Sequence, residues 1–319
     1  MGRKAVKLMI LSASRRTDIP NYFSDWLFRR ITEGYLYVRN PVNIHNISKI
    51  GLSPEIVDCI VFWTKNPEPM LSRLKELDSY KYYFQFTLTG LGRDIEKNIP
   101  DKKDKIIPAF IKLSSAIGRE KVIWRYDPIL FTNTYTPEYH LSAFSQIARA
   151  LEGYTRSCVI SFADIYSKNR KNMELIGAYD IKGEQLTDFV KKLSDIAQKN
   201  HMSVSSCAEA LNLSDCGVKH GCCIDKELIE SIVGYKINAA KDKNQRRECG
   251  CIESIDIGAY NTCPNACLYC YANNSVQSVC NNYKKYDGSS PILCSSVDAC
   301  DKISVRSSKS LKEYQLSLI

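Results

Sequence analysis

The 319-residue sequence lacks any long apolar run. A helix that crosses a membrane needs about 20 consecutive, mostly apolar residues, so the sequence offers no candidate for one. The basic N-terminus, Met1–Lys7, precedes an apolar stretch of only about five residues. A secretory signal needs about 7–15 residues there, and the stretch is better explained as a buried first strand. We therefore expect a cytoplasmic protein that does not associate with a membrane.

Histidine is scarce, whereas cysteine is abundant: the chain has 4 histidines and 14 cysteines. Any bound metal is therefore expected to be held mainly by thiolates, which favour zinc or iron–sulfur clusters. Cys59 and Cys158 lie in apolar runs, and the other cysteines fall between Cys207 and Cys300. Disulfides are typical of small secreted domains, which this chain does not resemble.

Short β-branched and aromatic runs alternate with segments of helical periodicity, which predicts βα units, a parallel sheet and an α/β fold. Eight runs are strand-like: 7–11, 35–38, 59–63, 82–88, 122–126, 158–162, 202–206 and 254–259. Helices are expected at 23–32, 67–76, 108–116, 138–151, 183–200 and 227–232. The predicted architecture is a (β/α) barrel or partial barrel over residues 1–273, including a cysteine-rich segment at 207–251. Residues 274–319 are polar and are expected to form a looser C-terminal extension.

Polar residues that follow strands in such a fold line its active face. The strongest candidates to face a substrate or cofactor are Arg15, Arg16, Lys65, Arg125 and Asp127. Arg39 and Asn40 follow the second predicted strand and are expected at the same rim.

The motif with the clearest chemistry is Cys263-Pro-Asn-Ala-Cys267-Leu-Tyr-Cys270. A compact loop can direct these three thiolates to three corners of a 4Fe-4S cluster, as cysteine-rich loops do in ferredoxins. No fourth cysteine follows at ferredoxin spacing, and the next one is Cys280. One iron would then be open to a small chelating molecule.

This motif resembles the cluster motif of the radical S-adenosylmethionine superfamily. The resemblance implies that Cys263, Cys267 and Cys270 hold a 4Fe-4S cluster, that S-adenosyl-L-methionine chelates the open iron, and that Tyr269 packs near the adenine. In that superfamily, reductive cleavage of S-adenosylmethionine gives methionine and a 5′-deoxyadenosyl radical. The motif normally follows the first barrel strand, so its position here implies a circular permutation, with the last strand beside the first. The usual Gly-Gly-Glu is missing after the first strand, where Ser12, Ser14 and Asp18 are the nearby substitutes.

The chain also resembles a bacterial family named domain of unknown function 1848, over most of residues 8–273. The resemblance is carried by Ser14–Asp18, Phe62–Pro67, Phe86–Gly90, Trp124–Pro128, Ser206–Glu209, Cys223–Asp225, Asp242–Cys251 and Asp256–Asn261. Thr64–Pro67, Phe86–Thr89 and Ile95-Glu96 are more distantly similar to segments of spore photoproduct lyase-like radical enzymes.

Six further thiols precede the loop: Cys207, Cys216, Cys222, Cys223, Cys249 and Cys251. We expect Cys207, Cys223, Cys249 and Cys251, which fall in the family-like segments, to bind an auxiliary iron–sulfur cluster, with zinc as the second choice. Cys280, Cys294 and Cys300 are expected to be free thiols.

Three functions remain open on the sequence. The first is a radical S-adenosylmethionine enzyme acting on an unidentified substrate, with ferredoxin or flavodoxin as low-potential electron donor. The second is a zinc-stabilised nucleic-acid-binding protein that uses cysteine knuckles structurally and basic segments such as Lys236–Arg247 for phosphate contact. The third, a ferredoxin-like electron carrier, is disfavoured because the loop lacks a fourth cysteine.

Overall fold

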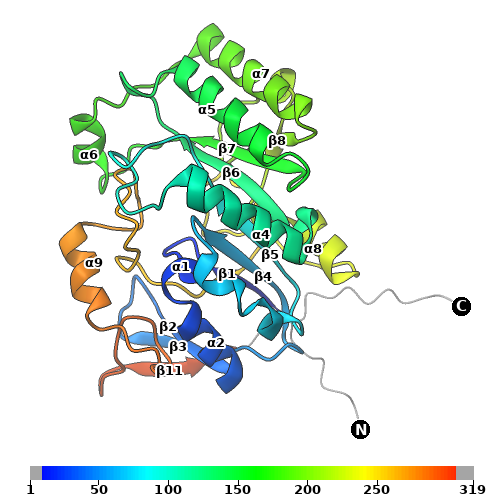
Figure 1. The fold of residues 1–319 in the computed structure, drawn as a ribbon. Helices are drawn as coiled ribbons and strands as arrows, with labels where there is room; N and C mark the ends of the chain where they lie inside the picture. The colour runs from blue at the N-terminus through cyan, green and yellow to red at the C-terminus, as the bar shows by residue number, and fades with distance from the viewer. Residues whose placement is uncertain (1–8, 307–319) are drawn as a thin grey trace, which may run out of the picture.

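The computed structural model describes residues 9–306 of the chain. Its main feature is an open sheet of eight parallel strands in the order β10-β1-β4-β5-β6-β7-β8-β9, the arrangement of a partial barrel (Figure 1). The strands are β1 (Met9–Ala13), β4 (Val57–Thr64), β5 (Tyr82–Thr87), β6 (Val122–Ile129), β7 (Ser157–Phe162), β8 (Ser203–Cys207), β9 (Val218–Gly221) and β10 (Ile255–Asp256). The predicted α/β fold with a parallel sheet is therefore confirmed. Residues 7 and 8 of the predicted first strand lie outside the described residues.

The last strand of the sheet lies beside the first. Leu11 pairs with Ile255 and Ser12 with Asp256, both in parallel register. This is the neighbour relation that the sequence predicts, and it carries the chain from β10 into the cysteine loop next to the end of β1.

Helices that connect the strands cover one face of the sheet. They are α1 (Ile19–Tyr22), α2 (Ser24–Glu33), α3 (Glu68–Leu71), α4 (Ile107–Ile117), α5 (Pro137–Ala150) and α7 (Gly183–Lys199), with α6 (Arg170–Leu175) near the strand ends (Figure 1). The large core on this face contains Phe62, Phe84, Trp124 and Phe144. The predicted helix at 67–76 is instead split into α3 and a 3-10 turn at Leu74–Leu77.

The opposite face is covered by α8 (Lys226–Val233) and the irregular segment around it, residues 222–252. A second apolar core there joins Val61, Tyr83 and Ile123 of the sheet to Ile224 and Ile237. Because side chains alternate along a strand, odd-numbered residues of β5 to β8 face this core while even-numbered ones face the helices. The exception is Ile129, which follows an irregularity in β6 and packs on the helical face. The face opposite the connecting helices is called the inner face below. It carries Arg125 and Asp127 of β6 and Cys207 at the end of β8.

One predicted strand was assigned to the wrong sheet. The run at 35–38 is β2 (Tyr35–Arg39), which pairs antiparallel with β3 (Asn46–Gly51) in a separate three-stranded sheet. Between them, the side chain of Asn40 accepts hydrogen bonds from Val42 N (2.9 Å) and Asn43 N (3.1 Å). A connection this short joins antiparallel strands only, so Arg39 and Asn40 are not at the active rim. The eighth parallel strand is the short edge strand β9, whose polar sequence gave no strand pattern.

The C-terminal extension, as far as residue 306, is an ordered part of the fold. It contains α9 (Val276–Tyr283) and β11 (Lys302–Val305), and β11 pairs in parallel with β3 (Figure 1). The indole of the buried Trp26 donates to Ser290 O (2.8 Å), and Phe23 packs edge-on against Tyr286. The expectation of a looser extension is thus wrong for residues 274–306, and residues 307–319 lie outside the described residues. No helix in the described part of the chain is long and apolar enough to span a bilayer.

Candidate active site

The cysteine loop is tied by its backbone to the segment that follows β5. Leu268 N donates to Ile95 O (3.0 Å), and Asn98 Nδ2 donates to Pro264 O (2.7 Å). Asn98 N also donates to Asn265 O (3.2 Å). These contacts join two segments far apart in sequence, so the loop position is set by the whole sheet.

Asparagine side chains hold the loop from its other sides. Asn169 Nδ2 donates to Tyr269 O (2.9 Å), and Asn172 Nδ2 donates to Leu268 O (3.1 Å). Asn273 Nδ2 donates to Cys263 O (2.8 Å). The backbone carbonyls are thus satisfied without the thiol groups, which face the pocket described below.

The loop thiols lie in surroundings that disfavour an uncompensated negative charge. Burial raises the pKa of Cys267 to about 12, although the nearby Lys65 ammonium acts in the opposite direction. Burial also raises the pKa of Cys263 and of Cys270. A bound metal supplies the positive charge that a thiolate needs in such a place.

The three loop sulfurs lie too far apart to bind one metal ion together. Within residues 9–306, the only three histidine, cysteine or acidic ligand atoms lying within 4.8 Å of one another belong to His45, Cys300 and Asp301. A tetrahedral zinc with Zn–S bonds of about 2.3 Å would bring its sulfur ligands to within about 4 Å of one another. Cys263, Cys267 and Cys270 are spread more widely than that.

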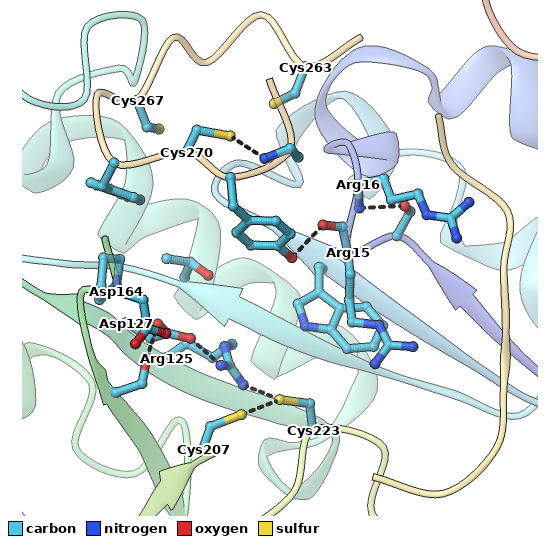
Figure 2. Close-up of a pocket in the computed structure, with 18 of the residues that line it drawn as sticks. Arg15, Arg16, Arg125, Asp127, Asp164, Cys207, Cys223, Cys263, Cys267 and Cys270 are labelled. Carbon is cyan, nitrogen blue, oxygen red and sulfur yellow. Dashed lines mark hydrogen bonds and ion pairs between the residues drawn. The ribbon is translucent and has the colours of Figure 1, made fainter. Parts of the chain in front are cut away.

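The loop forms one wall of a pocket of about 580 Å³, a size typical of small-molecule sites. Figure 2 shows the loop cysteines on one side of this pocket and Cys207 and Cys223 on the other, with Arg15 and Arg125 between them. Trp63 and Tyr271 add aromatic surface. The guanidinium of Arg15 lies over the Trp63 ring, 5.8 Å from its centroid.

A buried ion-pair network lies against the loop. Glu96 Oε1 is 2.7 Å from Lys65 Nζ, and its other oxygen accepts from Lys102. The hydroxyl of Tyr269 also donates to Glu96. Burial alone would raise the pKa of Glu96, but the two ammonium groups outweigh it and lower the pKa to about 2.

Asp256, at the end of β10, organises the end of β1. Its carboxylate accepts from Ser12 Oγ (2.8 Å), Ser14 Oγ (2.7 Å) and Arg15 N (2.8 Å). Gly258 N donates to it as well (3.0 Å). The two serines predicted to help hold S-adenosylmethionine therefore already donate their hydroxyls to Asp256.

Asp18 connects three parts of the site. Its carboxylate accepts from Lys65 N (2.8 Å), Asn265 Nδ2 (3.2 Å) and Asn21 N (3.2 Å). Burial raises the pKa of this carboxyl group, and the hydrogen bonds act against the increase. Asp18 thus joins the ends of β1 and β4 to the cysteine loop.

Arg125, which is buried, and Asp127, which is half-buried, form a second ion pair on the inner face of β6. The Arg125 guanidinium donates to Asp127, to Gln85 Oε1 (3.1 Å) and to Cys223 Sγ (3.0 Å). Ser161 donates its hydroxyl to the other oxygen of Asp127. Burial would raise the pKa of Asp127, but Arg125 and Ser161 lower it overall.

Most of the residues predicted from the sequence line this one pocket. They are Ser14, Arg15, Arg16, Asp18, Lys65, Arg125, Asp127, Cys207, Cys223, Cys249, Cys251, Cys263, Cys267, Tyr269 and Cys270. Ser12 does not line the pocket, and its hydroxyl donates a hydrogen bond to Asp256. Arg16 lies over the ring of Tyr260, 5.1 Å from its centroid.

Sequence reasoning did not identify the roles of Asp256, Glu96 and Lys102. Asp256 carried a usable signal, because it is the one charged residue inside the predicted strand 254–259. Lys102 carried none, since it lies in a run of mixed charge at residues 101–105, which is typical of a solvated surface.

The family model described as "Domain of unknown function (DUF1848)" matches residues 10–272. The chain belongs to this family. The DUF1848 match includes the eight-stranded sheet except Met9, the pocket lining except Asn273 and all three loop cysteines, and it ends before α9. No curated protein matches the chain.

Proposed function

We propose that this DUF1848 protein is a radical S-adenosylmethionine enzyme whose 4Fe-4S cluster is held by Cys263, Cys267 and Cys270. The observation that carries the proposal is the loop itself, with three thiols facing a pocket of about 580 Å³. When bound there, the cluster would supply the electron for reductive cleavage of S-adenosyl-L-methionine, which also binds at the cluster's open iron.

The donor set of the loop fits such a cluster. Thiolates are the ligands that iron–sulfur clusters prefer. Asp18 and Glu96, the carboxylates that interact with the loop thiols, are occupied by hydrogen bonds to Lys65 and other protein groups. Neither carboxylate is therefore spare to close the remaining coordination position, which supports an open iron.

The remaining pocket residues would bind and orient rather than react. Arg15, Arg16, Lys65 and Arg125 bring positive charge to the walls, which suits the carboxylate of S-adenosylmethionine and an anionic substrate. Asp127 is the acidic group on the inner face, where it holds the Arg125 guanidinium in place. Trp63, Tyr269 and Tyr271 offer aromatic surface for an adenine and for exclusion of water.

Fold relationships support the same proposal. A pocket at the carboxyl ends of parallel strands is where (β/α)-barrel enzymes place their active sites. The β10–β1 pairing is what a circularly permuted barrel of the radical S-adenosylmethionine type requires. The alternative, a zinc-stabilised nucleic-acid-binding protein, fits less well, because the loop thiols are more widely spread than the ligands of one zinc ion.

An electron donor is also part of the proposal. Lys241, Lys243 and Arg247 are exposed on the segment that leads to Cys249. Such a basic surface complements acidic proteins such as ferredoxin or flavodoxin. We expect one of these to supply the low-potential electron in a cytoplasmic setting.

The test is anaerobic purification followed by addition of dithionite and S-adenosylmethionine. We expect a brown protein that forms 5′-deoxyadenosine, detected by liquid chromatography, and a Cys267→Ala variant that forms none. Cys280→Ala, at an exposed position outside the loop, is the matched control and should match the wild type. A colourless zinc protein, or full activity of Cys267→Ala, would refute the proposal.

A further inference from the structure

The wall of the pocket opposite the cysteine loop holds a second group of thiols. Cys207, Cys223, Cys249 and Cys251 are all buried, with exposed fractions of 8%, 5%, 5% and 1%. They come from the end of β8, from the residues after β9 and from the residues before β10. Four thiols gathered from separate chain segments are a typical ligand set of zinc and iron–sulfur sites.

The four thiols form a connected series. Cys207 Sγ lies 3.0 Å from Cys223 Sγ (Figure 2). Cys223 N donates in turn to Cys251 Sγ (3.3 Å), and the thiols of Cys251 and Cys249 lie near enough to shift each other's pKa. No three of these sulfurs lie within 4.8 Å of one another in the described chain, so the group spans more space than the ligands of a single tetrahedral ion.

The surroundings of these sulfurs are built for thiolates. Arg125, which is 4% exposed, donates to Cys223 Sγ (3.0 Å). The backbone N–H groups of Cys223 (3.3 Å) and Ile224 (3.4 Å) both donate to Cys251 Sγ. Hydrogen bonds to sulfur and a nearby cation stabilise a negatively charged, thiolate-ligated cluster.

The backbone that carries Cys223 is held in place independently of the sulfurs. Its carbonyl oxygen accepts from Tyr83 Oη (2.6 Å) and Gln85 Nε2 (2.9 Å), two side chains on the inner face of β5. The site is therefore positioned by the sheet, as a preorganised metal centre requires.

The structure also separates these four thiols from their neighbours. Cys216 packs in the core on the helical face, where its Sγ contacts Thr187 O (3.6 Å). Cys222 is adjacent in sequence to Cys223 but, like Cys216, is not among the residues that line the pocket. The sequence offers six thiols and favours these four, and the same four line the pocket.

We propose that Cys207, Cys223, Cys249 and Cys251 bind a second iron–sulfur cluster with complete thiolate coordination. Because four thiolates leave no open iron, this cluster stores an electron beside the pocket and does not bind S-adenosylmethionine. Its existence is independent of the proposed activity at the loop.

The test is iron and sulfide content after anaerobic reconstitution. The wild type should bind about eight iron atoms per chain, and the triple variant Cys263→Ala/Cys267→Ala/Cys270→Ala should keep about four, the content of one cluster. The matched control, Cys216→Ala/Cys222→Ala, should retain the wild-type content. A triple variant without iron, one with a single zinc ion instead, or a control that loses half of the iron would overturn the proposal. So would a Cys207–Cys223 disulfide, measured as two thiols protected from alkylation in the anaerobically isolated protein.

A spectroscopic test addresses the closed coordination. In the reduced triple variant, the electron paramagnetic resonance signal should not change when S-adenosylmethionine is added, and a change would contradict complete thiolate ligation. This measurement needs no enzymatic turnover. Failure of the second cluster and failure of S-adenosylmethionine cleavage are therefore distinguishable.

Discussion

The ammonium group of Lys65 lies 2.7 Å from the buried carboxylate of Glu96, directly beside the cysteine loop. Glu96 also forms an antiparallel bridge with Cys267, so its backbone and its side chain both contact the loop region. Lys102 donates to the same carboxylate, which places two cations around one anion. The position of the loop therefore depends on a charge balance in a site with little solvent.

Replacing Glu96 by glutamine should be strongly destabilising. The substitution leaves the half-buried Lys65 and Lys102 without their counter-charge, and we expect a cost of about 3 kcal/mol, the lower end of the range for buried ion pairs. Urea unfolding measures the change, and iron content after reconstitution should fall because the loop is displaced. The matched control is Glu76→Gln, which breaks the solvent-exposed pair with Arg73 and should cost less than about 1 kcal/mol. Equal losses in the two variants would contradict this interpretation.

Asp256→Asn tests the junction of β1 and β10. Each carboxylate oxygen accepts two hydrogen bonds, from Ser14 and Gly258 on one side and from Ser12 and Arg15 N on the other. An amide must turn its NH₂ group toward one pair of donors, at a cost of about 1–3 kcal/mol. We expect a lower urea midpoint and reduced iron binding. Asp287→Asn, in an exposed turn with Ser289, is the control, and a similar midpoint shift there would argue against the special role of Asp256.

The sequence was sufficient to place Arg125 and Asp127 among the residues of the rim. They lie at the carboxyl end of the predicted strand 122–126, and both line the pocket in the structure. This worked because the pattern that marks a strand and its end is a local property. The helices around 183–199 and 138–150 were predicted for the same reason.

The errors and omissions come from contacts that no local pattern contains. The strand 35–38 has the same composition as a barrel strand, and only its hairpin with Asn46–Gly51 assigns it to another sheet. The hydrogen bonds of Asn98 to the cysteine loop join residues 166 positions apart. Likewise, Cys222 and Cys223 are adjacent thiols that differ in the sequence only by the family resemblance, and the structure places Cys223 but not Cys222 in the pocket lining.

Gly258→Ala should perturb the approach of the cysteine loop to β1. A Cβ at Gly258 would lie 2.1 Å from Ser14 Oγ and 2.6 Å from Ser14 Cβ, so Ser14 or the loop backbone must move. Overpacking of this kind costs about 1–3 kcal/mol, and we expect a matching loss in urea unfolding together with weaker iron binding. At Gly288 the nearest atom to a new Cβ is Tyr286 Oη at 3.6 Å, so Gly288→Ala should be neutral. An unchanged free energy of unfolding for Gly258→Ala would show that the end of β1 moves without loss of stability.

His140 gives the protein a defined loss of stability in acid. Its ring is buried between Tyr126 Oη (2.8 Å from Nδ1) and Leu130 O (3.0 Å from Nε2), so Nε2 carries the proton and Nδ1 accepts. Burial lowers the pKa of this imidazole from 6.5 to about 4. Between these values the unfolded chain binds the additional proton, so the stability contributed above pH 6.5 falls as the pH decreases toward 4. At pH 5 the loss from this one group is about 2 kcal/mol relative to pH 7.5.

Urea unfolding of wild type and His140→Asn at both pH values measures this loss, since other acid effects are shared by the two proteins. The wild type should lose about 2 kcal/mol more than the variant, and parallel losses would mean that His140 is protonated in the folded protein.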